Sequence, residues 1–112
     1  VKTLRLCSLA NDGHTLVIES VDMEIDDTTF GEVGVCSYSW GFNRTSYIDK
    51  ETGLAWETSI HSETMARAAL KFFKKVWIDG LCIIQCLDWH KTANLAIMGQ
   101  IYWHGCVVTE TF

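Results

Sequence analysis

The sequence predicts a single α/β domain, residues 1–112, with a mainly parallel sheet flanked by helices and a β-hairpin at its N-terminal end. From residue 33 onward, strand-like and helix-like segments alternate, which is the pattern of parallel strands joined by crossover helices. Val76 to Gln85 is an apolar segment that suits a central strand of such a sheet. The 112 residues, 48% hydrophobic and 21% charged, suffice for one modest core.

The N-terminal segment predicts the hairpin. Two β-prone runs, Thr3 to Leu9 and Thr15 to Ser20, flank Asn11-Asp12-Gly13, which supplies the positive φ angles of a tight turn. The acidic stretch that follows suits a solvated connection, and its carboxylates are Glu19, Asp22, Glu24, Asp26, Asp27 and Glu32. Val33 to Tyr38 is partly β-branched and lies between glycines, so we expect a short buried strand there.

The middle of the chain predicts a loop and then a helix. Phe42 to Ser59 is polar and rich in turn residues, which suggests a loop with a small strand around Tyr47 and Ile48. Ser62 to Lys75 predicts a helix, because its apolar residues recur at spacings of three and four and its last turn is rich in lysine, which suits the negative end of the helix dipole.

The C-terminal third completes the alternation. Val76 to Gln85 is expected to be the central parallel strand, and Asp88 can cap a second helix that runs to about His104. The apolar stripe of that helix consists of Leu95, Met98, Ile101 and Tyr102. Cys106 to Thr109 is expected to begin a further strand. In such sheets, ligands bind beyond the carboxyl ends of the strands, so the polar residues at 37–41, at Asp79 and at 82–85 are the candidate site.

Composition excludes two classes of partner. The net charge of −5 argues against a phosphate-binding surface, because nucleic-acid binders usually carry a clustered basic face. Apolar runs such as Leu81 to Ile84 fall far short of the roughly 18 residues that a membrane span needs. We therefore expect neither a nucleic-acid partner nor a membrane-spanning segment.

The cysteines indicate a reducing, cytoplasmic setting. The chain has five, an odd number, and four of them lie in apolar, strand-like sequence, where a free thiol packs as a small hydrophobe. Cys82, Cys86 and His90 are spaced by four, and thiolate and imidazole are the ligands that zinc prefers. However, there is no CxxC pair, and Cys82 is expected in a strand while His90 is expected in a helix, so a metal site is disfavoured.

Three sequence blocks carry a family resemblance. CSYSWG at 36–41, WIDGLCIIQ at 77–85 and MGQIY at 98–102 resemble, in order and separation, the signature blocks of the fungal heterokaryon incompatibility (HET) domain. The segment Thr3 to Leu6 resembles the usual run-in to the first block. The resemblance covers nearly the whole chain but only the front of the family domain, so we expect the domain to be incomplete at its C-terminus.

HET domains are regarded as distant relatives of the Toll/interleukin-1 receptor (TIR) fold. The resemblance implies a flavodoxin-like sheet, self-association, and other signalling domains as partners. It also implies a role in cell death and innate immunity, and cleavage of NAD at the nicotinamide bond in active members. In the TIR-like arrangement, the glutamate that serves this cleavage lies on a helix after the third parallel strand, which would fall beyond Phe112. We therefore expect no tightly bound cofactor, NAD as a substrate of the complete domain, and no turnover by these 112 residues.

Several residues depart from the family pattern. Ile84 stands where the family usually has Asn, and Cys86 and Leu87 replace a commonly acidic pair. His90 replaces a usual Glu, and Asn94 a usual Gln. Since each lost hydrogen bond is worth about 0.5 to 1.5 kcal/mol, ligand affinity or catalysis is expected to be reduced.

The resemblance implies a nucleotide pocket, and its residues would be Ser37, Trp40, Gly41, Asp79 and Gln85. Trp40 has two roles open to it, stacking on a base or covering the local core. Asp79 lies in an apolar segment, where a carboxylate needs a partner, and a structural hydrogen bond to the loop after Trp40 is favoured over catalysis. Cys82 is expected to be a packed thiol and not a nucleophile, because an apolar setting raises its pKa.

Two functions of different class follow. One is a TIR-like NAD hydrolase, part of a self/non-self recognition or cell-death protein. The alternative is a non-catalytic interaction or signalling module with the same fold, in which the polar residues near Gln85 have been lost because no chemistry requires them.

Overall fold

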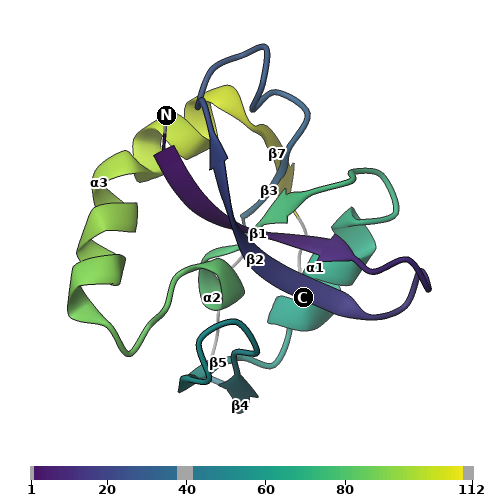
Figure 1. Ribbon diagram of the computed structural model, residues 1–112. Helices are drawn as coiled ribbons and strands as arrows, with labels where there is room; N and C mark the ends of the chain where they lie inside the picture. Colours follow the sequence, from purple (N-terminus) through teal and green to yellow (C-terminus); the bar gives the residue numbers. More distant parts are fainter. Residues whose placement is uncertain (1, 38–41, 110–112) are drawn as a thin grey trace.

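The computed structural model describes residues 2–37 and 42–109, and a five-stranded sheet lies at its centre (Figure 1). The strand order is β2-β1-β6-β3-β7. The strands are β1 (Lys2–Leu9), β2 (Leu16–Met23), β3 (Gly34–Ser37), β6 (Val76–Trp77) and β7 (Cys106–Thr109). Two further strands, β4 (Arg44–Ile48) and β5 (Ala55–Ser59), form a separate antiparallel pair.

The sheet is mixed, so the expectation of a mainly parallel sheet is wrong. β3 pairs in parallel with β6 on one side and with β7 on the other. The predicted N-terminal hairpin is confirmed, but it joins the same sheet, because β1 pairs antiparallel with β6 through Cys7 and Val76 as well as with β2. Half of the pairings are therefore antiparallel.

The turn between β1 and β2 forms as its residues predict. Gly13 has a φ of 75°, in the left-handed region that glycine adopts without a steric cost. The Asp12 carboxylate accepts hydrogen bonds from the backbone N–H groups of His14 at 2.7 Å and Thr15 at 2.9 Å. The Thr15 hydroxyl also donates to this carboxylate, at 2.6 Å. That bond, followed by the two backbone bonds, lowers the pKa of Asp12 to about 2.

The segment predicted as a loop, 42–59, is instead a second hairpin, although the small strand predicted around Tyr47 and Ile48 is confirmed within β4. Its turn is closed by the Asp49 N–H, which donates to the Leu54 carbonyl at 2.8 Å. The rings of Tyr47 and Trp56 face each other across the two strands, with centroids 5.0 Å apart. Polar composition misled the prediction, because these strands bury only part of one face.

Helix α1 (Ser62–Ala69) starts as predicted but ends well before Lys75. Leu70 is its C-terminal cap, and residues 70–75 reverse the chain so that it can enter β6 at Val76. The three lysines that were assigned to the last helical turn, Lys71, Lys74 and Lys75, therefore follow the helix. Phe72, one of the apolar residues of the predicted helix, lies beyond its end and is 84% exposed.

The predicted central strand is wrong over most of its length. Only Val76 and Trp77 pair as a strand, and the chain then forms the short helix α2 (Asp79–Cys82), with the Cys82 N–H donating to the Ile78 carbonyl at 2.8 Å. The segment is buried from Val76 to Ile84 apart from Asp79, so it is apolar on every side. Periodicity cannot separate a buried strand from a buried helical turn in such a sequence.

Helix α3 (Asp88–His104) and strand β7 are confirmed. Leu87 and not Asp88 is the N-terminal cap of α3, without a side-chain capping bond. Ile101, from the predicted apolar stripe, is fully buried, whereas Leu95 is 54% exposed. Among the described residues, every helix is too short or too polar to serve as a transmembrane segment.

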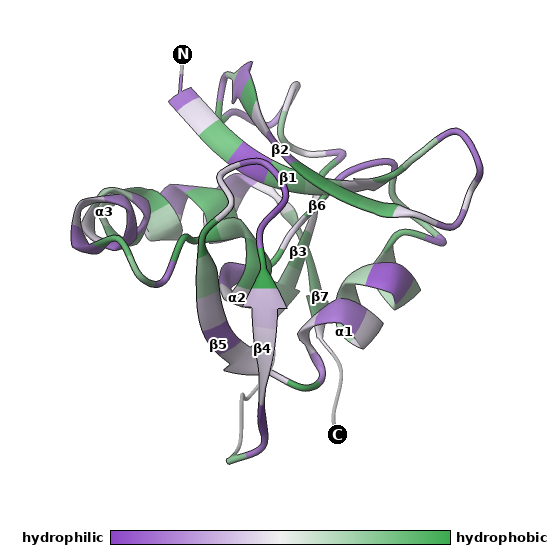
Figure 2. Cartoon of the chain, turned by 60° about the horizontal axis from the view of Figure 1, so that its bottom comes forward, coloured by the Kyte–Doolittle hydropathy of each residue, from purple (hydrophilic) through white to green (hydrophobic). Residues whose placement is uncertain are grey.

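The helices α1 and α3 lie on opposite sides of the sheet in both views (Figures 1 and 2). Alternate residues of β3 serve the two sides: Gly34 faces the Phe73 ring that follows α1, and Val35 lies against Gly105 at the end of α3. Figure 2 shows polar residues on the β1–β2 turn and hydrophobic residues on the strands at the middle of the molecule. The largest fully buried side chain is that of Trp77.

Candidate functional site

The carboxyl ends of β3 and β6 lie side by side, because the two strands are parallel neighbours. β3 ends at Ser37, and β6 ends at Trp77, two residues before Asp79. Ser37 and Asp79 are both half-buried at this edge of the sheet. The structure thus places these two predicted site residues at neighbouring strand ends, as the sequence predicted.

Tyr102 from α3 joins these two residues. Burial is the main reason why its pKa is raised, and the nearby Asp79 carboxylate raises the pKa further, while a side-chain hydrogen bond with Ser37 acts in the opposite direction. The Tyr102 ring also meets the buried Trp77 ring edge-on, with centroids 6.1 Å apart. Tyr102 was predicted only as part of an apolar stripe, although its place in the MGQIY block was a signal for a second role.

Gln85 completes the group. Its Nε2 donates a hydrogen bond to the Asp79 backbone carbonyl at 3.0 Å, across the turn of α2. The amide therefore ties the end of the WIDGLCIIQ block to Asp79, and its oxygen has no hydrogen-bond partner among the described residues. We call Ser37, Asp79, Gln85 and Tyr102 the strand-end site.

Two predicted site residues, Trp40 and Gly41, lie outside the described residues. The hydrogen bond expected between Asp79 and the loop after Trp40 is untested for the same reason. Asp79 is the first residue of a short helix and not part of a strand, which corrects its predicted setting. A carboxylate suits this position, since the first turn of a helix carries partial positive charge.

The thiol of Cys82 is packed, as predicted, but in α2 and not in a strand. It lies 3.7 Å from the Cys7 sulfur, and both residues are fully buried. The contact with Cys82 and burial raise the pKa of Cys7, which disfavours a reactive thiolate. Within residues 2–37 and 42–109, His, Cys, Asp and Glu side chains do not gather in a group of three that could hold a metal ion.

A buried ionic cluster that was not predicted from the sequence supports α2. Arg5 on β1 is 3% exposed and forms an ion pair with Asp49, which is fully buried in the turn of the β4–β5 hairpin. A second carboxylate, that of Glu51, lies 3.4 Å from the Arg5 Nε. The signal was an arginine in the middle of an apolar strand sequence, since a buried charge needs a partner.

This cluster reaches α2 through two backbone carbonyls. Arg5 donates to the Leu81 carbonyl at 3.3 Å, and the Trp56 indole donates to the Gly80 carbonyl at 2.9 Å. Carbonyls at the end of a four-residue helix lack helical partners, so these donors satisfy groups that would otherwise be left unpaired. The N-terminal strand and the second hairpin therefore hold the helix that begins with Asp79.

His90 closes the turn between α2 and α3. Its Nδ1 accepts a hydrogen bond from the Ile84 N–H at 3.0 Å, and the Asn94 amide donates to the His90 carbonyl at 2.9 Å. Burial lowers the pKa of His90, with Arg5 as a further cause, which favours the neutral ring that can accept this bond. Two of the residues that depart from the family pattern thus stabilise the backbone.

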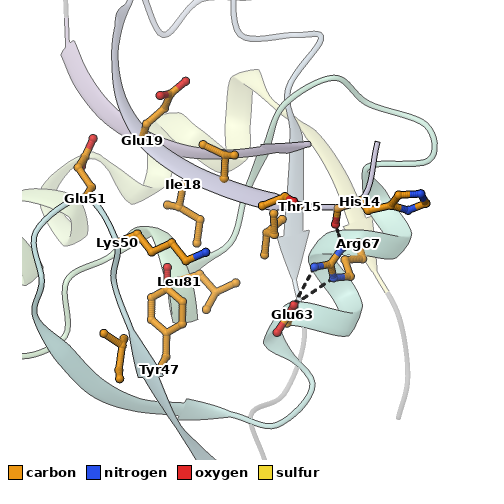
Figure 3. Close-up of a pocket in the computed structure, with 13 residues that line it drawn as sticks. His14, Thr15, Ile18, Glu19, Tyr47, Lys50, Glu51, Glu63, Arg67 and Leu81 are labelled. Carbon is orange, nitrogen blue, oxygen red and sulfur yellow. Dashed lines mark hydrogen bonds and ion pairs between the residues drawn. The ribbon is translucent and has the colours of Figure 1, made fainter. Parts of the chain in front are cut away.

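A cavity of about 700 Å³ lies away from the strand-end site, between β2, the β4–β5 hairpin and α1 (Figure 3). Its apolar walls include Ile18, Tyr47 and Leu81, and charged groups such as Lys50 and Arg67 lie around it. The predicted site residues that the structure describes, Ser37, Asp79 and Gln85, do not line it.

The family comparison agrees with the three sequence blocks. The model of the heterokaryon incompatibility protein (HET) family matches residues 35–110, more than half of the chain. A search of curated proteins and a search of solved structures gave no significant match. The matched range includes most of β3 and all of α2 and α3, and it contains every residue of the strand-end site. The chain belongs to the heterokaryon incompatibility protein (HET) family.

Proposed function

We propose that this chain acts in self/non-self recognition leading to cell death, and that its strand-end site binds an NAD-like nucleotide. The observation that carries the proposal is that Ser37 and Asp79 lie at the carboxyl ends of neighbouring parallel strands and that Tyr102 of α3 lies near both. Each of the three family blocks thus contributes one residue. A carboxylate beside hydroxyl groups suits the hydroxyls of a ribose, and the partly exposed ring of Tyr102 suits contact with a base.

The strand order supports a TIR-like, flavodoxin-like relationship for the parallel part of the sheet. β3 comes first in the chain and lies between β6 and β7, so the parallel strands run second, first, third across the sheet. The same order characterises flavodoxin-like sheets, in which ligands bind where the strand order reverses. The antiparallel β1 and β2 would then be an addition at one edge.

The proposal is tested by titrating NAD into the chain and by following the release of nicotinamide. Asp79→Asn is expected to weaken NAD binding about tenfold, because a hydrogen bond to a charged group is worth about 1.5 to 3 kcal/mol. Tyr102→Phe, which keeps the ring, is expected to weaken it less. Asp88→Asn, at the exposed start of α3, serves as the control and should bind as the unchanged chain does.

We expect binding without turnover by residues 1–112. NAD binding that is absent, or that is equally strong in Asp79→Asn, would refute the nucleotide site. Robust release of nicotinamide by this chain would refute the view that the cleavage glutamate lies outside it.

A second candidate is a non-catalytic signalling module that acts through self-association or other signalling domains. The observation that favours it is the burial of Ile84, which is 4% exposed at the position where the family usually has Asn. A chain that fails to bind NAD but keeps its fold would support this candidate.

A further inference from the structure

Strand β2 forms one edge of the sheet, and part of this edge opens into the cavity of Figure 3. In an antiparallel pair, the N–H and C=O groups of alternate residues point toward the partner strand and away from it. The Ser20 N–H donates to Glu51 on the hairpin at 2.7 Å, so the even-numbered residues of β2 point away from β1. Leu16 and Ile18 therefore direct their backbone groups toward the free edge.

The stretch of this edge from Leu16 to Ile18 is open, and side chains bond to the backbone of β2 or its turn at both ends of it. At one end, the Glu51 carboxylate binds both the N–H and the hydroxyl of Ser20. At the other end, Arg67 of α1 donates to the His14 carbonyl at 2.6 Å. Within the described part of the chain, no residue bonds to the outward groups of Leu16 and Ile18. The N–H and C=O groups of Leu16 and Ile18 are thus unpaired, and the side chains of Glu51 and Arg67 lie at the two ends of this stretch.

The open stretch is too short for another whole strand. An extended chain advances about 3.4 Å per residue, so Leu16 to Ile18 matches roughly three residues of a paired segment. The β2 edge of a second copy would meet the side chains of Glu51 and Arg67 before it could pair along its length. A cavity of about 700 Å³ lies in the range of pockets that hold small ligands.

Lys50 gives the cavity a positively charged group that suits an anionic ligand. Its side chain extends from the hairpin into the cavity (Figure 3), and it makes no hydrogen bond or ion pair with any described residue. Three carboxylates line the cavity, and two of them are engaged, since Glu63 pairs with Arg67 at 3.0 Å and Glu51 with Ser20. The third, that of Glu19, points away from Lys50 (Figure 3). A ligand carboxylate would find an unpaired ammonium group beside the apolar surface of Ile18, Tyr47 and Leu81.

We infer that this cavity binds the carboxyl-terminal end of a short extended peptide. The peptide backbone pairs with Leu16 and Ile18, an apolar side chain packs on the cavity wall, and the terminal carboxylate meets Lys50. Addition of a strand to a free sheet edge is a general mode of peptide recognition. The site is separate from the strand-end site and does not depend on NAD binding.

The test uses the ¹⁵N-labelled chain and the peptide N-acetyl-Ala-Val-Leu with a free carboxylate. Before any addition, the amides of Leu16 and Ile18 should exchange with solvent faster than those of Val17 and Glu19, which face β1. The peptide should shift the Leu16 and Ile18 amide signals most and slow their exchange. N-methylation of the central peptide amide should weaken binding at least about fivefold, since one backbone hydrogen bond is lost.

Two changes probe the carboxylate contact. A C-terminally amidated peptide and the variant Lys50→Ala should each weaken binding about threefold to tenfold. Lys91→Ala, on the exposed surface of α3, is the control and should leave binding unchanged.

Three results would overturn the inference. The Leu16 and Ile18 amide signals could fail to shift at about 5 mM peptide, a concentration at which even a ligand with a Kd of about 1 mM would occupy most of the sites. The amidated peptide could bind as well as the free acid. The same signals could shift with protein concentration alone, which would make a second copy of the chain the occupant.

Discussion

Arg5 shows how one residue supports the strand-end site from a distance. Its guanidinium is buried beside Asp49 and donates to the Leu81 carbonyl of α2. The removal of one member of a buried ion pair leaves the other charge without compensation, which costs more than the pair itself contributes. The cluster therefore makes the position of α2 sensitive to residues far from it in the sequence.

Asp49→Ala is expected to lower the free energy of unfolding by about 3 to 5 kcal/mol, because Arg5 would lose its buried partner. Glu63→Ala removes the exposed pair with Arg67 and should cost less than about 1 kcal/mol. Urea unfolding of both variants measures the difference. Equal losses would contradict a special role for the buried pair.

His90 gives the fold a pH dependence. Its pKa is lower in the folded chain than the ordinary value of 6.5, so the unfolded chain binds the proton more readily. Above about pH 6.5 both states are neutral and the stability is complete; as the pH falls from there toward the lowered pKa, stability is lost. Urea unfolding between pH 7.5 and about pH 5 should show this loss, and His90→Asn should remove the part due to His90. A slope that is unchanged in the variant would assign it to other groups.

Three of the site residues could be named from sequence, and one was missed. Ser37, Asp79 and Gln85 were found because polar residues at strand ends stand out and because they lie in the family blocks. Tyr102 was not, since its hydrophobic ring fits the apolar stripe of α3 as well as it fits a site. A side chain that serves both roles carries no separate periodic signal.

At the scale of elements, the wrong predictions concern a segment that is buried almost throughout and a hairpin whose strands are mostly polar. The segment 76–85 is buried almost throughout, so its composition could not distinguish a strand from the turn of α2. Strand β4 is largely exposed, and the buried residues of β5 include the polar Thr58 and Ser59, so the hairpin sequence lacked the apolar alternation that predicts strands. Helix α3 was predicted with both ends nearly right, because a long segment between turn residues leaves few alternatives.

Two glycines of the α3 region should respond in opposite ways to alanine. A Cβ at Gly99 would meet open space, so Gly99→Ala should stabilise the chain by about 0.5 to 1 kcal/mol through helix propensity. A Cβ at Gly105 would overlap the Val35 side chain and lie 2.9 Å from the Ile101 carbonyl oxygen, so Gly105→Ala should cost about 1 to 3 kcal/mol. Thermal unfolding of the pair tests the packing of α3 against β3, and shifts of the same sign would refute it.

At the scale of the whole molecule, the exposure of each cysteine depends on whether it lies inside the packed sheet or on the surface. All five are among the described residues, and none is disulfide-bonded. Cys7, Cys36 and Cys82 are buried, from β1, β3 and α2, whereas Cys86 and Cys106 are exposed. The expectation that four cysteines pack in apolar surroundings is correct for three of them.

Alkylation of the native chain should therefore modify Cys86 and Cys106 first. The other three should react only when the molecule unfolds, because burial protects them and the pKa of the Cys7 thiol is raised. Mass spectrometry after brief treatment with iodoacetamide, with and without urea, counts the modified sites. Rapid modification of Cys7 or Cys82 without urea would mean that the sheet opens easily between β1 and α2.

The sequence by itself determined the α/β class, the first hairpin, α3, β7 and membership of the HET family, since each depends on local periodicity, turn residues or ordered blocks. Only the tertiary structure decided that β1 joins β6 to make a mixed sheet, that Arg5 finds Asp49, and that Tyr102 reaches Ser37 and Asp79. These features depend on contacts between residues far apart in the chain. Such contacts are chosen by the packing of whole elements and the pairing of buried charges, and they leave no periodic pattern in the sequence.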